Sequence, residues 1–264
     1  MSTYVLVPGF WLGGWAWEEV AGPLRAAGHD VHPLTLTGLG DRSHLAGPGV
    51  DLETHIDDIV QVIVHADLRE VILVAHSGAG APVTGAADRI PERIARVVYL
   101  DSGPVADGLT QLDLYDPAQR EYIERSAAAC GGTAYPPPSW EHFERSGVSL
   151  EGMGAAERAR FTAGATAQPY GTLTRPLKLG GGADRLPKTL ITCSYPLEQV
   201  RAMIEAAHPY FAALAGPEWS FAAVPTGHWP MFSAPAATAA ALAELGVEGE
   251  SPSPDGAREI VNRV

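Results

Sequence analysis

Ser77 has the surroundings that nucleophilic chemistry requires. It lies in Val-Ile-Leu-Val-Ala-His-Ser-Gly-Ala-Gly (71–80), where an apolar run is followed by small residues. A nucleophilic serine needs an exposed oxygen, a neighbouring base and N–H donors for the oxyanion that forms. A sharp strand-to-helix turn exposes the oxygen, and its usual pattern has glycine two residues before and after the serine. Here Ala75 and Ala79 occupy those positions. We predict a nucleophile at Ser77, with a helix-capping serine as the alternative.

His228 is the candidate base. It lies in Val-Pro-Thr-Gly-His-Trp-Pro-Met-Phe (224–232), between the last expected strand and the last expected helix. Loops at the carboxyl ends of parallel strands are where α/β sheets bind ligands. Gly227 and Pro230 restrict the shape of this loop, as a base that must reach a serine hydroxyl requires. The other histidines are expected in helices, caps, turns or the core, and His76 is expected to point away from Ser77: His29, His32, His44, His55, His65, His76, His142 and His208.

Three segments together resemble the α/β-hydrolase superfamily. They are Val-Pro-Gly-Phe-Trp-Leu-Gly-Gly-Trp-Ala-Trp (7–17), the turn at 75–80 and Gly-His-Trp-Pro-Met (227–231). The likeness is greatest to the branch with plant methyl esterases, hydroxynitrile lyases and actinobacterial esterase-like proteins. It implies an oxyanion hole made by the backbone N–H groups of Phe10 and Gly78. Pro8 replaces the usual histidine of the first loop, which leaves backbone donors unaffected.

The acid that orients the histidine is not where this branch usually has it. An aspartate normally follows the next-to-last strand, but Pro196 occupies that place in Ile-Thr-Cys-Ser-Tyr-Pro-Leu-Glu (191–198). Asp101, at the end of Val-Val-Tyr-Leu-Asp (97–101), keeps the chain order serine, acid, histidine and is our choice. Glu198 is the alternative, and Asp101 would then cap the following chain. A third alternative is a site that has no acid beside the histidine.

These residues need a parallel sheet to bring them together. Strand and helix patterns alternate along 1–103 and 187–246, which predicts an α/β-hydrolase core with helices on both faces of a mostly parallel sheet. The run at 71–75 is typical of a strand buried on both faces, and 31–36 is expected to be the second strand. Residues 104–186 break the alternation and are predicted to form a small, partly helical cap. Residues 247–264 are predicted to be a loosely attached tail.

Composition restricts the possible partners. The 264 residues carry a net charge of -13, which disfavours nucleic acid and anionic membranes. The N-terminus lacks the basic region of a signal peptide, and the two cysteines suggest neither a disulfide framework nor a metal site. We expect a cytoplasmic enzyme without cofactor or metal, acting on a small molecule, with a homodimer possible.

The predicted reaction is acyl transfer to Ser77 with His228 as general base, followed by hydrolysis. An ester-type bond of a small apolar or aromatic carbonyl compound suits this machinery, although lactones, thioesters and carbon–carbon bonds beside a carbonyl also do. Trp11 and Trp229 are the expected pocket residues, and Trp15 and Trp17 are expected to pack the first helix. The alternatives are a cofactor-free non-hydrolytic or carbon–carbon-cleaving enzyme of natural-product metabolism, and a catalytically silent binding scaffold. Further candidate pocket or core residues are aromatic or Met: Phe10, Tyr135, Trp140, Phe143, Met231 and Phe232.

Overall fold

The protein is built on one six-stranded parallel sheet. A computed structural model describes residues 1–207 and 211–247. The strands lie in the order β2-β1-β3-β4-β7-β8, and every neighbouring pair is parallel. Their bounds are β1 Thr3–Val7, β2 Asp30–Pro33, β3 Val71–His76, β4 Ile94–Leu100, β7 Lys188–Thr192 and β8 Trp219–Ala223. This confirms the predicted α/β-hydrolase fold.

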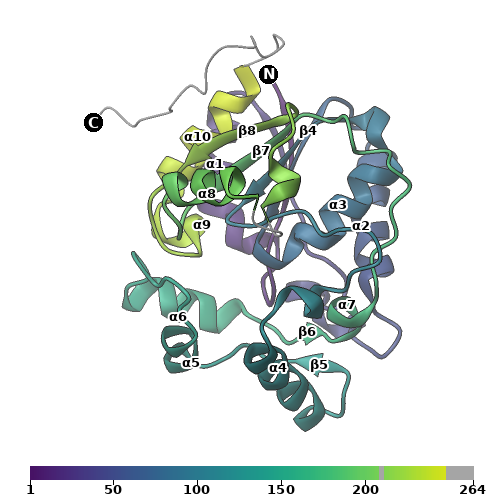
Figure 1. Ribbon diagram of the computed structural model, residues 1–264, viewed down its shortest axis with the longest axis vertical. Coiled ribbons are helices and arrows are strands. Elements are labelled where there is room, and N and C mark those ends of the chain that lie inside the picture. Colours follow the sequence, from purple (N-terminus) through teal and green to yellow (C-terminus); the bar gives the residue numbers. More distant parts are fainter. Residues whose placement is uncertain (208–210, 248–264) are drawn as a thin grey trace.

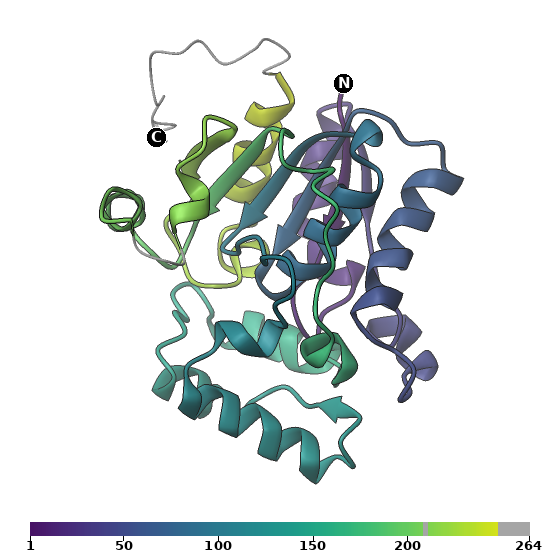
Figure 2. The same cartoon turned by 45° about the vertical axis from the view of Figure 1, so that its right-hand side comes forward.

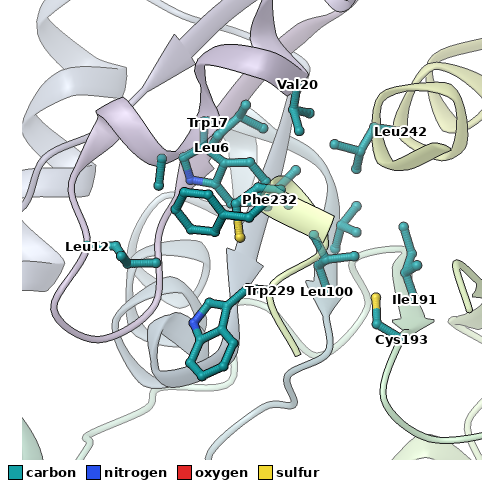
Figure 3. Packing of buried hydrophobic residues seen from close by; sticks show 14 of the residues in the cluster. Leu6, Leu12, Trp17, Val20, Leu100, Ile191, Cys193, Trp229, Phe232 and Leu242 are labelled. Carbon is teal, nitrogen blue, oxygen red and sulfur yellow. The ribbon is translucent and has the colours of Figure 1, made fainter. Parts of the chain in front are cut away.

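Side chains that alternate along the strands form one core on each face of the sheet. Tyr4 and Leu6 of β1 point into one core, and Val5 and Val7 into the other. The first core packs against α1 (Glu18–Ala26) and α10 (Pro235–Val247), and Figure 3 shows part of it, including Trp17. The second packs against α2 (Leu52–His65) and α3 (Gly80–Arg89). Every residue of β3 is buried, which explains its continuous apolar run.

Residues 104–186, here called the insert, connect β4 to β7. The insert contains α4 (Pro117–Ala129), α5 (Trp140–Arg145), α6 (Ala155–Gly164), α7 (Gly171–Thr174) and a two-stranded antiparallel sheet of β5 (Ala134–Tyr135) and β6 (Gln168–Pro169). Figures 1 and 2 place most of it at the end of the sheet opposite the N-terminus, where the strands have their carboxyl ends. The insert therefore lies over the edge at which the candidate catalytic residues were predicted.

The remaining elements are short, apart from α8 (Leu197–Glu205), and α9 (Pro230–Ser233) follows the His228 loop. β2 ends at Pro33 instead of the expected residue 36, and the Leu34 N–H makes the last contact with β1 by donating to the Leu6 carbonyl at 2.9 Å. Within the described residues no helix is long and apolar enough to cross a membrane.

The predicted tail at 247–264 lies outside the described residues except for position 247. The 3₁₀ turns are Gly14–Trp17, Gly40–Leu45, Ser77–Ala79, Pro91–Arg93, Gln111–Leu114 and Ala212–Leu214.

Candidate active site

Ser77 occupies a strained turn between β3 and α3. Its φ is 51°, a left-handed conformation that non-glycine residues rarely adopt, and a 3₁₀ turn over Ser77–Ala79 leads into the helix. The Ser102 hydroxyl donates to the Ser77 carbonyl at 2.6 Å and holds the turn from the next strand. A Cβ at Gly80 would collide with the carbonyl oxygen of Gly103. A close approach to the backbone of the neighbouring loop therefore requires glycine at position 80, while the alanines at 75 and 79 are accommodated.

His228 reaches Ser77 from the loop between β8 and α9. Its Nε2 lies 2.8 Å from Ser77 Oγ. The insert fixes this loop, because the backbone N–H of His228 donates to the Ser149 carbonyl at 2.9 Å and that of Gly227 to the Glu151 carbonyl at 3.1 Å. The structure thus brings the predicted nucleophile and base into hydrogen-bond contact, although they are 151 residues apart in the chain.

Asp101 lies on the far side of the His228 ring. Its Oδ2 is 2.6 Å from Nδ1 of His228, and its side chain is only 4% exposed. Ser194 donates to Oδ2 through its hydroxyl at 2.6 Å, while Oδ1 accepts the N–H groups of Cys193 at 2.9 Å and Ser194 at 3.0 Å. Glu198, the alternative acid, instead lies in the first turn of α8. Of the two candidates, Asp101 is the carboxylate that meets the histidine.

The electrostatics of the site define the tautomer of His228. Burial favours the neutral form of the Asp101 carboxyl, but hydrogen bonds from His228 and Ser194, together with the charge of His228, outweigh burial and lower its pKa. A carboxylate only accepts hydrogen bonds, so Nδ1 of His228 carries a proton and donates it to Asp101. Nε2 of a neutral ring is then left free to accept the Ser77 hydroxyl proton. The arrangement can therefore take a proton from Ser77.

Three candidate-site residues share an uncommon backbone conformation. Trp11, Ser77 and Asp101 have φ values of 67°, 51° and 44°, and they follow the adjacent strands β1, β3 and β4. The described residues contain only three other non-glycine residues with positive φ, at positions 67, 70 and 207. Such strain persists where surrounding contacts enforce it, and it is often found at functional sites.

The Phe10 side chain packs against Gly78, and both residues were expected to supply oxyanion donors. A Cβ at Gly78 would collide with the Phe10 ring, so that ring rests directly on the residue after the serine. Gly9, before Phe10, is equally confined, because a Cβ there would lie 2.8 Å from Nδ1 of His76 and 2.9 Å from Cβ of Ser77. The loop after β1 is thus pressed against the turn that carries Ser77.

Trp11 and Trp229, the expected pocket residues, are both buried. The Trp11 ring packs against Tyr135 of the insert at a centroid distance of 5.4 Å. The Trp229 ring packs against Phe143 and Phe161 at 5.0 and 5.2 Å, and lies 5.2 Å from the His228 ring. Met231 and Phe232 are also buried, as is Trp17, while Trp15 is partly buried against the same core. These rings join the insert to the sheet beside the candidate catalytic residues.

His76 contacts the candidate base, which the sequence interpretation did not anticipate. It was expected to point away from Ser77, and its Nε2 donates to the backbone carbonyl of His228 at 2.7 Å while its ring lies 5.1 Å from the His228 ring. Nδ1 is buried without a hydrogen-bond partner. Burial, and then the nearby charge of His228, lower the pKa of His76, so the ring is neutral. A signal was available, because an imidazole next to the nucleophile at the end of a buried strand must find a partner.

Metal ligation has no candidate here. Among the described residues there is no group of three or more His, Cys, Asp or Glu side chains that could hold a metal ion.

Comparisons with known proteins identify a family and several relatives of this chain. A model of the alpha/beta hydrolase family matches residues 4–241. A carbendazim hydrolyzing esterase of Nocardioides sp. (strain SG-4G) is 35% identical over 254 residues, which cover 93% of this chain and 100% of the esterase. Methyl jasmonate esterase 1 of Vitis vinifera is 26% identical over 197 residues, 72% of each chain.

Solved structures extend the likeness to the whole fold. An extracellular alpha/beta-hydrolase from a Paenibacillus species superposes with a TM-score of 0.78 at 23% identity, covering 92% of this chain and 98% of that one. The family match, the 35% identical relative and the parallel sheet give one conclusion. The chain belongs to the α/β-hydrolase family, as a hydrolase of the esterase type.

Proposed function

We propose that the protein hydrolyses an ester-type bond of a small apolar or aromatic carbonyl compound through an acyl-enzyme on Ser77. The observation that carries the proposal is the hydrogen-bonded series from Ser77 Oγ to His228 Nε2 at 2.8 Å, and from His228 Nδ1 to Asp101 Oδ2 at 2.6 Å. Acyl transfer to serine needs a nucleophile, a base and a group that orients the base, in this mutual contact.

In the proposed first half of the reaction, Ser77 Oγ attacks the substrate carbonyl carbon while Nε2 of His228 takes the hydroxyl proton. The negative charge on the resulting oxyanion is stabilised by the backbone N–H groups of Phe10 and Gly78. Collapse of the tetrahedral intermediate breaks the ester C–O bond, and His228 returns the proton to the leaving oxygen. Asp101 remains ionised and stabilises the imidazolium.

In the second half, a water molecule loses a proton to Nε2 of His228 and attacks the acyl carbon. The bond to Ser77 Oγ then breaks, the serine regains its proton, and the free acid leaves. No cofactor enters either half.

The proposed substrate class rests on the residues beside the reacting groups. Phe10, Trp11 and Trp229 flank the serine and histidine loops, and their rings offer apolar walls to an acyl or aryl group. Two relatives named for hydrolysing carbendazim and methyl jasmonate support an ester-type reaction. That Trp11 and Trp229 line the substrate pocket is part of this proposal.

Pre-steady-state hydrolysis of p-nitrophenyl acetate and p-nitrophenyl benzoate tests it. We expect a burst of nitrophenol that corresponds to one acyl group on each active site, with the acyl mass on the peptide that contains Ser77, and none of it in Ser77→Ala. Turnover that persists in Ser77→Ala would contradict the proposal. No ester turnover at all would favour the binding-scaffold or non-hydrolytic alternatives.

A further inference from the structure

Trp11, the residue after the proposed oxyanion donor Phe10, is bound to the insert through every polar group it has. Its backbone N–H donates to Oε1 of Gln168 at 3.2 Å, and its Nε1–H donates to the Tyr135 carbonyl at 3.1 Å. Its own carbonyl accepts the backbone N–H of Thr166 at 2.9 Å. The three partners belong to the two-stranded β5–β6 sheet or to the chain leading into it. This single residue therefore joins the insert to the loop after β1.

We propose that Gln168 is a positioning residue for the oxyanion hole, acting through Trp11 on the Phe10 N–H. The inference rests on the proposed function, since it concerns the reaction at Ser77. The Trp11 N–H belongs to the peptide unit that begins at the Phe10 carbonyl. Fixing its direction fixes ψ of Phe10, and with it the orientation of the residue that carries the proposed donor.

Gln168 is itself held firmly enough for this role. Its side chain is buried, with the residue 2% exposed, and its Nε2 donates to the Thr172 hydroxyl at 2.9 Å. That hydroxyl in turn donates to the Pro169 carbonyl at 2.7 Å. Gln168 also pairs with Tyr135 in the β5–β6 sheet, so two of the three contacts to Trp11 come from residues that are paired with each other.

The backbone of Trp11 needs this support. Its φ of 67° is disfavoured for a bulky side chain, and such a conformation persists only where surrounding contacts over-determine it. Without the Gln168 acceptor, the buried N–H would lose its partner and the residue could relax toward negative φ. Phe10 would move with it, away from the small cavity that Phe10, Gly78 and Gln168 line together.

The test compares Gln168→Met, which keeps the side-chain length but removes the acceptor, with Gln168→Glu, which keeps an acceptor oxygen. Thr162→Val is the matched control, because it removes a hydroxyl that accepts Trp140 Nε1–H elsewhere in the insert. The readouts are kcat and KM for p-nitrophenyl acetate, and the inhibition constant of an aryl trifluoromethyl ketone. Its serine adduct places an oxyanion in the hole, so its affinity measures that hole directly.

We expect Gln168→Met to lower kcat by about 10- to 100-fold with KM nearly unchanged, less than the roughly 10²- to 10³-fold that accompanies loss of a whole donor. Trifluoromethyl ketone affinity should fall by a similar factor. Gln168→Glu should recover most of both, and Thr162→Val should match the wild type. The inference would be overturned if the Gln168→Met protein melted at a lower temperature but kept wild-type kcat and ketone affinity. Gln168 would then have only a structural role.

Two further outcomes are decisive. If Gln168→Met does not fold, Thr172→Val provides a milder form of the same test. It removes the hydroxyl that accepts a hydrogen bond from Nε2 of Gln168. It should lower kcat and ketone affinity by about 3- to 10-fold, and wild-type values would overturn the inference. If the wild type neither turns over the ester nor binds the ketone, the proposed function itself fails, an outcome distinct from the others.

Discussion

The loops after β4 and β7 are neighbours at one edge of the sheet, yet they have exchanged the roles that the family resemblance implied. The acid was implied after β7, where Pro196 stands, and the structure instead has the carboxylate of Asp101 after β4 against His228. The loop after β7 supplies donors to that carboxylate through Cys193 and Ser194. The loop after β4 provides the carboxylate, and the loop after β7 donates hydrogen bonds to it.

The exchange is possible because the two strands are adjacent and parallel. Leu100 pairs with Ile191, and the Asp101 N–H donates to the Ile191 carbonyl at 2.8 Å, so both loops leave the sheet at the same level. A carboxylate on either can face the same histidine. The position of an acid along the chain is therefore less constrained than its position in space, and the following changes test this division of roles.

The largest effect is expected from the loop after β4, which carries Asp101. Asp101→Asn should lower kcat for p-nitrophenyl acetate by about 10⁴-fold, the scale seen when the acid beside a catalytic histidine becomes an amide that supports the wrong tautomer. Glu198→Gln, in the first turn of α8 after the neighbouring loop, is the matched control and should leave kcat unchanged. The division of roles would be wrong if Glu198→Gln were inactive while Asp101→Asn kept wild-type turnover.

The loop after β7, which donates hydrogen bonds to Asp101, should contribute less to kcat. Ser194→Ala removes the hydroxyl that donates to Oδ2 of Asp101 but leaves two backbone N–H donors on Oδ1. We expect a fall in kcat of about 10-fold, which corresponds to one charge-assisted hydrogen bond. Ser126→Ala, which deletes a hydroxyl that donates to the Tyr122 carbonyl within α4, should have no effect on kcat. A loss with Ser194→Ala as large as that of Asp101→Asn would mean that the two loops act as one unit.

The smallest effect concerns stability at acid pH. The pKa of Asp101 is lowered in the folded protein, so its stabilising contribution is complete above the unfolded-state pKa of about 3.9 and is lost as pH falls through the lower folded value. Ser194→Ala removes one cause of that lowering. Ser194→Ala should therefore be less stable than the wild type at pH 5, by about 1 kcal/mol at most, and urea unfolding should show this difference shrinking as the pH falls toward the lowered pKa of Asp101. Identical pH profiles would show that the Ser194 hydroxyl does not hold the carboxylate.

The sequence predicted the fold well because the signals for it are local. The buried run at 71–75, the small residues after Ser77 and the loop around His228 each specify their own turn or strand. Right-handed parallel connections then bring the carboxyl ends together. Asp101 could be chosen from chain order and its place at a strand end, without knowledge of what holds it.

The missing parts depend on long-range contacts whose partners no local pattern identifies. Gln168 meets Trp11 across 157 residues, and His76 meets the His228 carbonyl across 152. Ser194 is an ordinary loop serine until the fold places it against Asp101. In each case the role is defined by the partner, and the partner is set by packing of the insert and loops against the sheet.

The central claim is that Ser77 is a nucleophile activated by His228 and Asp101, and active-site labelling with a fluorophosphonate tests it most directly. The folded wild type should gain one phosphonyl group by intact mass, on the peptide that contains Ser77. Labelling should be abolished in Ser77→Ala and slowed by orders of magnitude in Asp101→Asn. A folded wild-type protein that stays unlabelled, or is labelled at a residue other than Ser77, would contradict the account.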